Sequence, residues 1–142
     1  MDHSTAMTRE EKEMHHFYMG CALNQAEQAY IKDEVPIGAV IVYENQIIGK
    51  GFNQTRMHKT AIAHAEMIAV KEASLKLNAW QLNDCTIYST LEPCSMCAGA
   101  IVLSRINLLV FSIKDPKSGA CGSIFNIVQE PKLNHRLEVI SG

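Results

Sequence analysis

The sequence predicts an α/β domain with three layers, in which helices cover both faces of a five-stranded mixed sheet. Helical and β-rich segments alternate along the 142 residues. Strand–helix–strand order in the second half indicates parallel pairing with right-handed crossovers. Two earlier β-rich segments, separated by two residues, indicate an antiparallel hairpin. The length suits a single domain over residues 1–142.

The first half of the chain is expected to supply one long helix and the hairpin. Its helical segment is rich in good helix formers, and Val35-Pro36 ends it because proline restrains the residue before it. Glu44-Asn45 is expected to form the turn of the hairpin. The expected bounds are residues 10–31 for the helix, 37–43 and 46–52 for the two strands, and 53–60 for a polar loop.

The second half is expected to alternate between helices and strands. An apolar stripe at helical spacing predicts a helix from about Ala63 to Asn78. Pro93 is expected to lie in the first turn of the next helix, where its missing N–H does no harm. The remaining expected elements are strands at 86–91 and 108–113, a loop at 115–122, a short helix at 123–130 and a last strand at 137–140.

The composition indicates a globular protein, with 47% hydrophobic and 20% charged residues. Its apolar stretches are too short to span a bilayer, and the first dozen residues lack the apolar core of a secretory signal. We therefore expect a cytoplasmic location and no membrane partner. The five cysteines are an odd number, which argues against a disulfide framework.

The net charge of −2 gives no global sign of nucleic-acid binding, but the charge is unevenly distributed. Residues 1–49 hold 3 Lys and Arg against 8 Asp and Glu, whereas residues 50–142 hold 10 against 7. This distribution is compatible with a basic face on the larger segment, although uneven charge is more often solvated surface.

Two short motifs carry the chemistry, His64-Ala65-Glu66 and Pro93-Cys94-Ser95-Met96-Cys97. One imidazole and two thiolates suit zinc and leave its fourth position open to water, as a catalytic site requires. The carboxylate of Glu66 remains free to move protons. This H-x-E and P-C-x-x-C signature is typical of zinc-dependent base deaminases.

The spacing of these residues constrains where the site lies. His64 and Glu66 are two residues apart, so they can serve one site only beyond the N-terminus of their helix. Cys94 is expected in the first turn of its helix, with Cys97 beside it. Both helices then direct positive dipole ends at one point, which is expected to lower the pKa of the thiols. We expect zinc-activated water to attack an amidine-like carbon, with Glu66 as the proton shuttle.

Other interpretations remain open at this stage. A lone His64 is typical of a core histidine, and a lone C-x-x-C is also found in redox sites and in halves of zinc fingers. A structural zinc site normally has four protein ligands, and the sequence has no second C-x-x-C to complete one. A deaminase of a free base or nucleoside, of guanine or cytosine type, would share both motifs. A non-catalytic zinc-stabilised module would most simply lack Glu66.

From about residue 13 to residue 142 the chain resembles a known family. The stretches that carry the resemblance are Glu34–Val40, Gly51–Asn53, Ala63–Glu66, Thr90–Ala100, Asp115–Ala120 and Asn134–Arg136. They are similar to the bacterial tRNA-specific adenosine deaminases, within the cytidine/deoxycytidylate deaminase superfamily. The resemblance implies a cytidine-deaminase-like fold, one Zn²⁺ per subunit and a homodimer. It also implies hydrolytic deamination of the wobble adenosine in a tRNA anticodon stem-loop to inosine. The C-terminal helix of that family is expected to be missing here.

The resemblance also assigns roles to individual residues. The zinc ligands would be His64, Cys94 and Cys97, and the proton shuttle would be Glu66. The expected substrate-binding residues are Asn53, Ala65 and Leu91, around a base taken out of its stack, and Asp115, Lys117 and Ser118, near the ribose and flanking nucleotides. The alternatives are that Asn53 only begins a loop and that Asp115 only caps a turn. Candidate phosphate contacts are Arg56, Lys59, Lys117 and Arg136.

Overall fold

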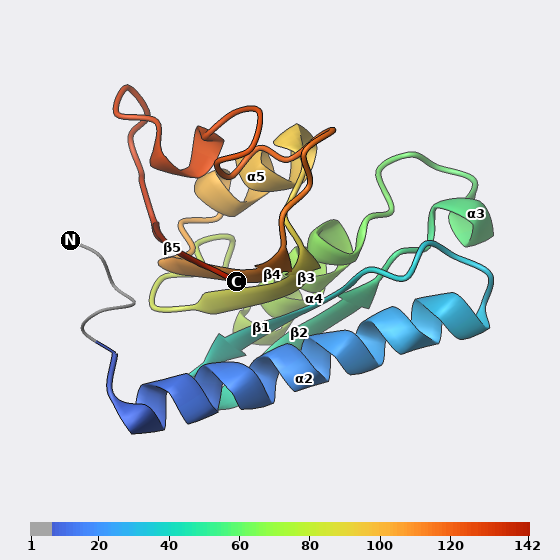
Figure 1. Ribbon diagram of the computed structural model, residues 1–142, viewed down its shortest axis with the longest axis horizontal. Coiled ribbons are helices and arrows are strands. Elements are labelled where there is room, and N and C mark those ends of the chain that lie inside the picture. The colour runs from blue at the N-terminus through green and yellow to red at the C-terminus, as the bar shows by residue number, and fades with distance from the viewer. Residues whose placement is uncertain (1–6) are drawn as a thin grey trace.

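The computed structural model describes residues 7–142 and contains one five-stranded mixed sheet with the strand order β2-β1-β3-β4-β5 (Figure 1). β1 pairs antiparallel with β2 and β3, whereas β4 pairs parallel with β3 and β5. This topology confirms the predicted fold class. Residues 1–6 of the predicted domain lie outside the described residues. The strands are β1 (Gly38–Tyr43), β2 (Gln46–Phe52), β3 (Thr86–Leu91), β4 (Leu108–Ile113) and β5 (Glu138–Ser141).

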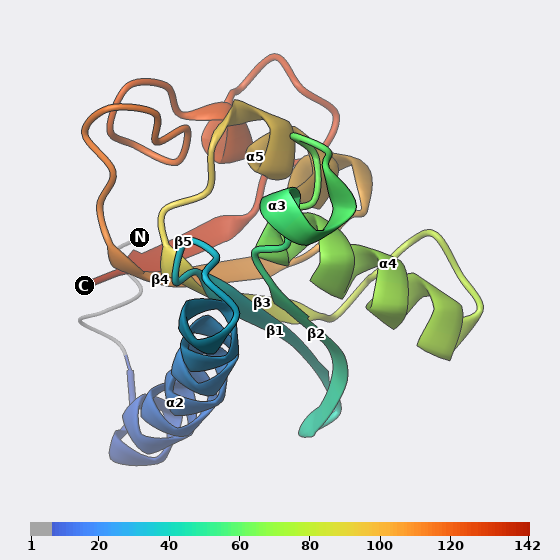
Figure 2. The ribbon, with the colours of Figure 1, turned by 90° about the vertical axis from the view of Figure 1, so that its right-hand side faces the viewer.

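Helices cover both faces of the sheet, which gives the three predicted layers. The long helix α2 (Arg9–Ile31) lies along one face, and α4 (Ala65–Leu77) and α5 (Ser95–Leu103) lie on the other (Figures 1 and 2). No helix in the described part of the chain is both long enough and apolar enough to cross a membrane.

The central strands bury alternate side chains on the two faces of the sheet. Val40 and Tyr88 belong to the apolar cluster under α2. Ile41 and Ile87 are their neighbours in sequence and belong to the larger cluster under α4 and α5. Because successive side chains of a strand point to opposite faces, two covered faces require a nearly continuous apolar strand. The sequence of β1, Gly-Ala-Val-Ile-Val-Tyr, is such a strand.

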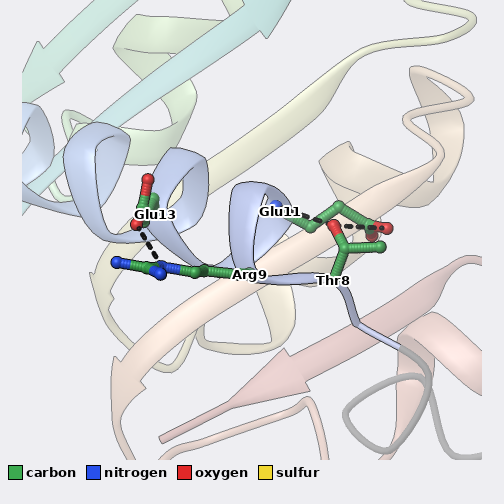
Figure 3. Close-up of polar contacts among 4 residues, drawn as sticks. All are labelled: Thr8, Arg9, Glu11 and Glu13. Atoms are coloured by element: carbon green, nitrogen blue, oxygen red, sulfur yellow. Dashed lines mark hydrogen bonds and ion pairs between the residues drawn. The ribbon is translucent and has the colours of Figure 1, made fainter.

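The start of α2 is set by local polar contacts (Figure 3). Thr8 is the N-cap residue, and its hydroxyl oxygen accepts a hydrogen bond from the N–H of Glu11 at 3.1 Å. Its hydroxyl group also lies 3.4 Å from the carboxylate of Glu11. Directly after the N-cap, Arg9 forms an exposed ion pair with Glu13, one turn along the helix, at 3.1 Å. The N-cap satisfies an N–H that has no partner within the helix, so the helix begins at a defined residue.

Two buried polar contacts fix α2 against the sheet. The Nδ1 atom of His15 lies 2.7 Å from the hydroxyl of Tyr88 on β3. The hydroxyl of Tyr18 donates to the carbonyl of Asn45, in the turn of the hairpin, at 2.9 Å. Glu44 and Asn45 both have positive φ, of 49° and 61°, as a two-residue type I′ turn requires. The predicted hairpin is therefore confirmed, with its tip held by the helix.

β2 packs against the backbone of α4 through two glycines. A Cβ atom on Gly49 would lie 2.3 Å from the carbonyl oxygen of Ala69, and one on Gly51 would lie 2.1 Å from that of Ala65. Both distances are shorter than any van der Waals contact, so only glycine fits. This close approach determines where the N-terminal end of α4 lies relative to the end of β2.

The segment predicted as a loop at 53–60 contains a short helix, α3 (Thr55–His58), and the prediction was wrong there. The carboxylate of Glu34 accepts hydrogen bonds from the N–H groups of Arg56 and Met57, at 3.1 and 2.7 Å. These are N–H groups of the first turn, which have no partner inside the helix. The cap comes from a residue more than twenty positions earlier, so local sequence did not reveal it.

The helix predicted at 123–130 is also wrong, because the segment holds only one 3₁₀ turn, η1 (Ile127–Gln129). The N–H of Ser123 donates to the side chain of Glu92. The N–H groups of the next two residues donate to the carbonyl of Gly119. Cys121 and Asn126 form an isolated β-bridge, and the N–H of Gly122 donates to the carbonyl of Phe125, so residues 123–126 form a turn and not a helix.

We expect Gly51→Ala to destabilise the protein by about 1–3 kcal/mol, because the added methyl group overpacks the contact between β2 and α4. Urea denaturation would measure the loss. Gly20→Ala is the matched control, since a Cβ at Gly20 on α2 meets nothing within 4 Å. Equal unfolding free energies for Gly51→Ala and the wild type would contradict the close contact.

Candidate metal centre

His64 and Glu66 lie at the N-terminal end of α4, as their spacing required. His64 is the N-cap residue, with φ −79° and ψ 153°, and its imidazole makes no capping hydrogen bond. The helix begins at Ala65, two residues later than predicted. Glu66 is therefore in the first turn. The extended backbone at His64 turns the imidazole towards the space in front of the helix.

Cys94 and Cys97 lie at the N-terminal end of α5. The prediction that Pro93 and Cys94 belong to the first turn was wrong, because Cys94 is the N-cap residue and the helix begins at Ser95. Cys94 is extended, with φ −75° and ψ 177°, and its side chain makes no capping hydrogen bond. The carbonyl of Pro93 accepts the N–H of Ala120 at 2.9 Å, which ties this segment to a neighbouring loop. The thiol of Cys94 is thus free to face Cys97, one turn further on.

The imidazole and the two thiols meet at one point. The Nδ1 atom of His64 lies 3.6 Å from Sγ of Cys94 and 3.5 Å from Sγ of Cys97. The three ligand atoms all lie within 4.8 Å of one another. Tetrahedral zinc with Zn–N near 2.1 Å and Zn–S near 2.3 Å requires nitrogen–sulfur separations of about 3.6 Å. The three donors therefore fit one zinc ion and leave a fourth position open.

Burial controls the protonation of these groups. It lowers the pKa of His64, which favours the neutral imidazole that binds a metal. It also raises the pKa of the Cys97 thiol, which outweighs the lowering expected from the helix dipoles. Thiolates at this place therefore need a compensating cation, and a divalent metal would supply it. The donor set and its surroundings thus favour an occupied site.

Glu66 is a buried acid beside the centre and is not one of its three donors. Its side chain is 4% exposed, and burial raises its pKa to about 7, opposed by its own N–H and by the Cys97 thiol. A carboxyl group with a pKa near neutrality can both accept and release a proton. Zinc bound at the centre would lower the pKa of a water molecule towards neutrality. The burial and the pKa of Glu66 are compatible with its predicted role as the proton shuttle.

Three further predicted site residues surround the two helix ends. Asn53 follows β2 directly and is 5% exposed, and its N–H donates to the carbonyl of Ile37 at 3.1 Å. Ala65 is fully buried at the start of α4, where its carbonyl group lies against Gly51 of β2. Leu91 ends β3, and its carbonyl accepts the hydroxyl of Ser89 at 2.7 Å. Their positions are compatible with the predicted contacts to a base.

Asp115, Lys117 and Ser118 lie in the loop after β4. The carboxylate of Asp115 accepts the N–H groups of Lys117 and Ser118, at 3.0 and 3.3 Å, and the hydroxyl of Ser118 at 2.7 Å. The hydroxyl of Ser118 is the main cause that lowers the pKa of Asp115, followed by the N–H of Lys117. Asp115 therefore does cap its own turn, and the side chain of Lys117 stays exposed. A contact with substrate remains a prediction.

Two of the candidate phosphate contacts donate hydrogen bonds to backbone carbonyl groups. Arg56 donates to the carbonyl of Asp33 at 3.1 Å. Arg136 donates to the carbonyls of Pro131 and Leu133. None of these hydrogen bonds connects either arginine to the metal centre.

One buried carboxylate beside the centre had been overlooked. Glu92 is 2% exposed, and its side chain accepts hydrogen bonds from the loop after β4. The sequence contained one signal for this residue, because an acidic residue stands between an apolar strand and Pro93. A charge at such a buried place needs several hydrogen-bond donors.

The fold and the centre together define a class of protein, an α/β zinc enzyme whose metal lies where two helix N-termini meet. Comparisons with known proteins agree with this class. Residues 12–113 match the family described as the cytidine and deoxycytidylate deaminase zinc-binding region. The chain belongs to this family of deaminases, and the expected zinc cofactor is confirmed.

Within this family, the chain is similar to several individual proteins. The chain is 46% identical over 136 residues to a tRNA-specific adenosine deaminase of Bacillus subtilis, covering 96% of this chain and 81% of that relative. A solved structure from work on A-to-I editing by tRNA:A34 deaminases at the wobble position of transfer RNA matches with a TM-score of 0.85 and 40% identity, covering 89% of this chain and 97% of that one. A guanine deaminase structure from Bacillus subtilis matches with a TM-score of 0.68 and 33% identity. The match covers 76% of this chain and 66% of that one.

We expect Cys97→Ser to lose most of its zinc. Changes to residues that merely support a metal ligand cost 10–100-fold in affinity, so loss of a ligand should cost at least about 100-fold. Metal analysis of the purified protein measures the zinc, and a thermal melt with and without chelator measures its coupling to stability. Cys21→Ser is the control, because Cys21 lies on α2 on the other face of the sheet. A Cys97→Ser protein that keeps one zinc per chain would contradict the assignment.

Proposed function

We propose that this chain hydrolytically deaminates the wobble adenosine of a tRNA anticodon stem-loop to inosine. The observation that carries the proposal is the match along nearly the whole chain to a tRNA-specific adenosine deaminase at 46% identity. The geometry of the metal centre supports it, because hydrolytic deamination needs a metal with an open position and a separate proton carrier.

The proposed roles follow from the site. His64, Cys94 and Cys97 would hold the zinc ion, and among the described residues no fourth side chain joins this cluster of donors. The carboxylate of Glu66 takes a proton from the attacking water and delivers it to the ring nitrogen. It then takes the proton of the new hydroxyl group at the attacked carbon and passes it to the amine, so that ammonia leaves and the carbonyl of inosine forms. Glu66 is only 4% exposed, which limits the access of bulk water to its carboxylate.

The proposed substrate contacts form two groups. Asn53 and the backbone at Ala65 and Leu91 lie near the helix ends, where a base removed from its stack could be read by hydrogen bonds. Asp115, Lys117 and Ser118 lie on the neighbouring loop, where ribose and flanking nucleotides would pass. An exposed Lys117 adds the positive charge that favours a phosphate backbone.

The main competing function is deamination of a free base. The match to the guanine deaminase structure covers 66% of that chain at a TM-score of 0.68, against 97% at 0.85 for the structure from the tRNA work. The stronger match favours the RNA substrate. The presence of a buried Glu66 beside the donors argues against a non-catalytic zinc module.

We also propose that the chain forms one domain and acts as a cytoplasmic homodimer. An apolar surface beside α5 supports the dimer, since Leu103 is 74% and Phe125 56% exposed. Leu133 lines two adjoining hollows, one with Leu103 and the other with Phe125. Exposed apolar residues that adjoin in this way are typical of protein–protein contacts.

We expect Glu66→Ala to keep its zinc and to lose inosine formation by roughly a thousandfold or more, because only the proton route is removed. The measurement is inosine content of a zinc-loaded reaction with an anticodon stem-loop RNA that carries a wobble adenosine. Glu72→Ala, at an exposed position on the same helix, is the matched control. Loss of zinc from Glu66→Ala, or equal loss of activity in the control, would contradict these roles. No inosine from the zinc-loaded wild type would refute the proposed substrate.

Leu103→Lys is expected to shift the protein from dimer to monomer, because it places a charge in the proposed apolar contact. Sedimentation velocity would measure the shift. Leu23→Lys is the control, since Leu23 is 52% exposed on the opposite side of the sheet, on α2. A wild type that sediments as a monomer would contradict the homodimer.

A further inference from the structure

The carboxylate of Glu92 is saturated by hydrogen bonds from one segment, residues 115–123. Its Oε1 atom accepts the N–H of Asp115 at 3.0 Å and the hydroxyl of Ser123. Its Oε2 atom accepts the N–H groups of Cys121 and Ser123, both at 3.0 Å. All four donors come from the loop after β4, and none from the strand or helix that flanks Glu92. A side chain with these partners holds the loop to the segment before α5.

The same loop lies directly against the zinc-binding segment. Gly119 forms a β-bridge with Cys94, and the N–H of Ala120 donates to the carbonyl of Pro93. A Cβ atom on Gly119 would lie 2.4 Å from both Cδ and Oε2 of Glu92. The glycine is therefore required for the carboxylate to reach its donors. The loop is held by its backbone next to Cys94 and by one buried side chain behind it.

Glu92 also determines where the proposed substrate contacts lie. It holds the N–H of Asp115, and the carboxylate of Asp115 in turn holds the N–H groups of Lys117 and Ser118. The turn that carries these exposed residues has no regular secondary structure to fix it. Its position relative to the metal centre is therefore set by the bonds to Glu92 together with the backbone contacts of Gly119 and Ala120.

We propose that Glu92 is a positioning residue for RNA, which holds the loop 115–123 beside the metal centre so that Asp115, Lys117 and Ser118 can bind nucleotides next to the reacting base. This inference rests on the proposed function. The hydrogen bonds of the Glu92 side chain go to the loop and not to a zinc donor, and on this proposal Glu92 does not touch the reacting atoms. Its loss should therefore weaken RNA binding more than it slows the chemical step.

The chemistry of the contact requires a carboxylate. Both oxygens accept two hydrogen bonds, and all the partners are donors. Glutamine has nearly the same shape, but its NH₂ group would replace one of the two oxygens and leave at least one N–H of the loop without an acceptor, since among the four donors only the Ser123 hydroxyl can turn to accept. Glu92→Gln is thus a change of hydrogen-bond polarity with little change in volume.

Two variants at different positions test the same contact. Glu92→Gln removes acceptors, and Gly119→Ala displaces the carboxylate by the methyl group for which there is no room. Gly20→Ala is the control for the second substitution, since its methyl group lies in open space on α2. Leu82→Ala is the control for general loss of stability, because Leu82 is fully buried and its N–H donates to the carbonyl of Ser104, at the end of α5 opposite to the zinc-binding segment.

The experiment uses the zinc-loaded protein and has two readouts. Amide hydrogen exchange of residues 115–123 measures whether the loop is held, whatever the substrate is. Steady-state kinetics with the anticodon stem-loop RNA separate KM from kcat. For Glu92→Gln and Gly119→Ala we expect faster exchange in the loop, unchanged zinc content, a KM increase of roughly tenfold and a kcat within about threefold of the wild type. The double variant should be no worse than either single variant, because both break one contact.

Several outcomes would overturn the proposal. These are unchanged exchange in the loop of Glu92→Gln, a fall in kcat at unchanged KM, or an equal rise in KM for Leu82→Ala. A wild type that forms no inosine would refute the proposed function instead, and the exchange measurement would still decide whether Glu92 holds the loop.

Discussion

The convergence of two helix N-termini on one point is the constraint on which the rest of the structure depends. His64 and Cys94 are both N-cap residues with extended backbones, and neither side chain caps its own helix. Each side chain is therefore available to the space between the helices. The N-terminal ends contribute partial positive charge, which suits a site with two thiolates and a nearby carboxylate. A shift of either helix by one residue would separate the donors.

The sheet provides the precision that this convergence needs. Gly49 and Gly51 bring β2 against the backbone of α4, and the small side chains of Ala69 and Ala73 keep that distance short. On the other face, α2 is held by the bonds from His15 and Tyr18. The metal centre thus lies at the end of a rigid three-layer core, while the loop after β4 is attached to it by a side chain.

Elements with a strong local pattern were predictable from sequence, and elements held by distant side chains were not. β3 and β4 were expected at 86–91 and 108–113 and have those bounds, because each is an apolar run with turn residues beside it. The three zinc donors and Glu66 were predictable because the chemistry needs those residue types at that spacing. The short helix α3 and the irregular segment before η1 were missed, because their N–H groups bond to Glu34 and Glu92, more than twenty positions away. A local pattern contains no information on such partners.

The separation of the donors along the chain has a consequence for folding. Thirty positions separate His64 from Cys94, and β3 lies between them. A metal bound to both residues closes that segment into a ring, as a cross-link does. In the chain-entropy description, closing a ring of this size lowers the conformational entropy of the unfolded chain, which corresponds to roughly 3.5 kcal/mol of free energy. The ion that activates water would thus also cross-link the chain segments before and after β3 for as long as it stays bound to both, and removing it would take that cross-link away.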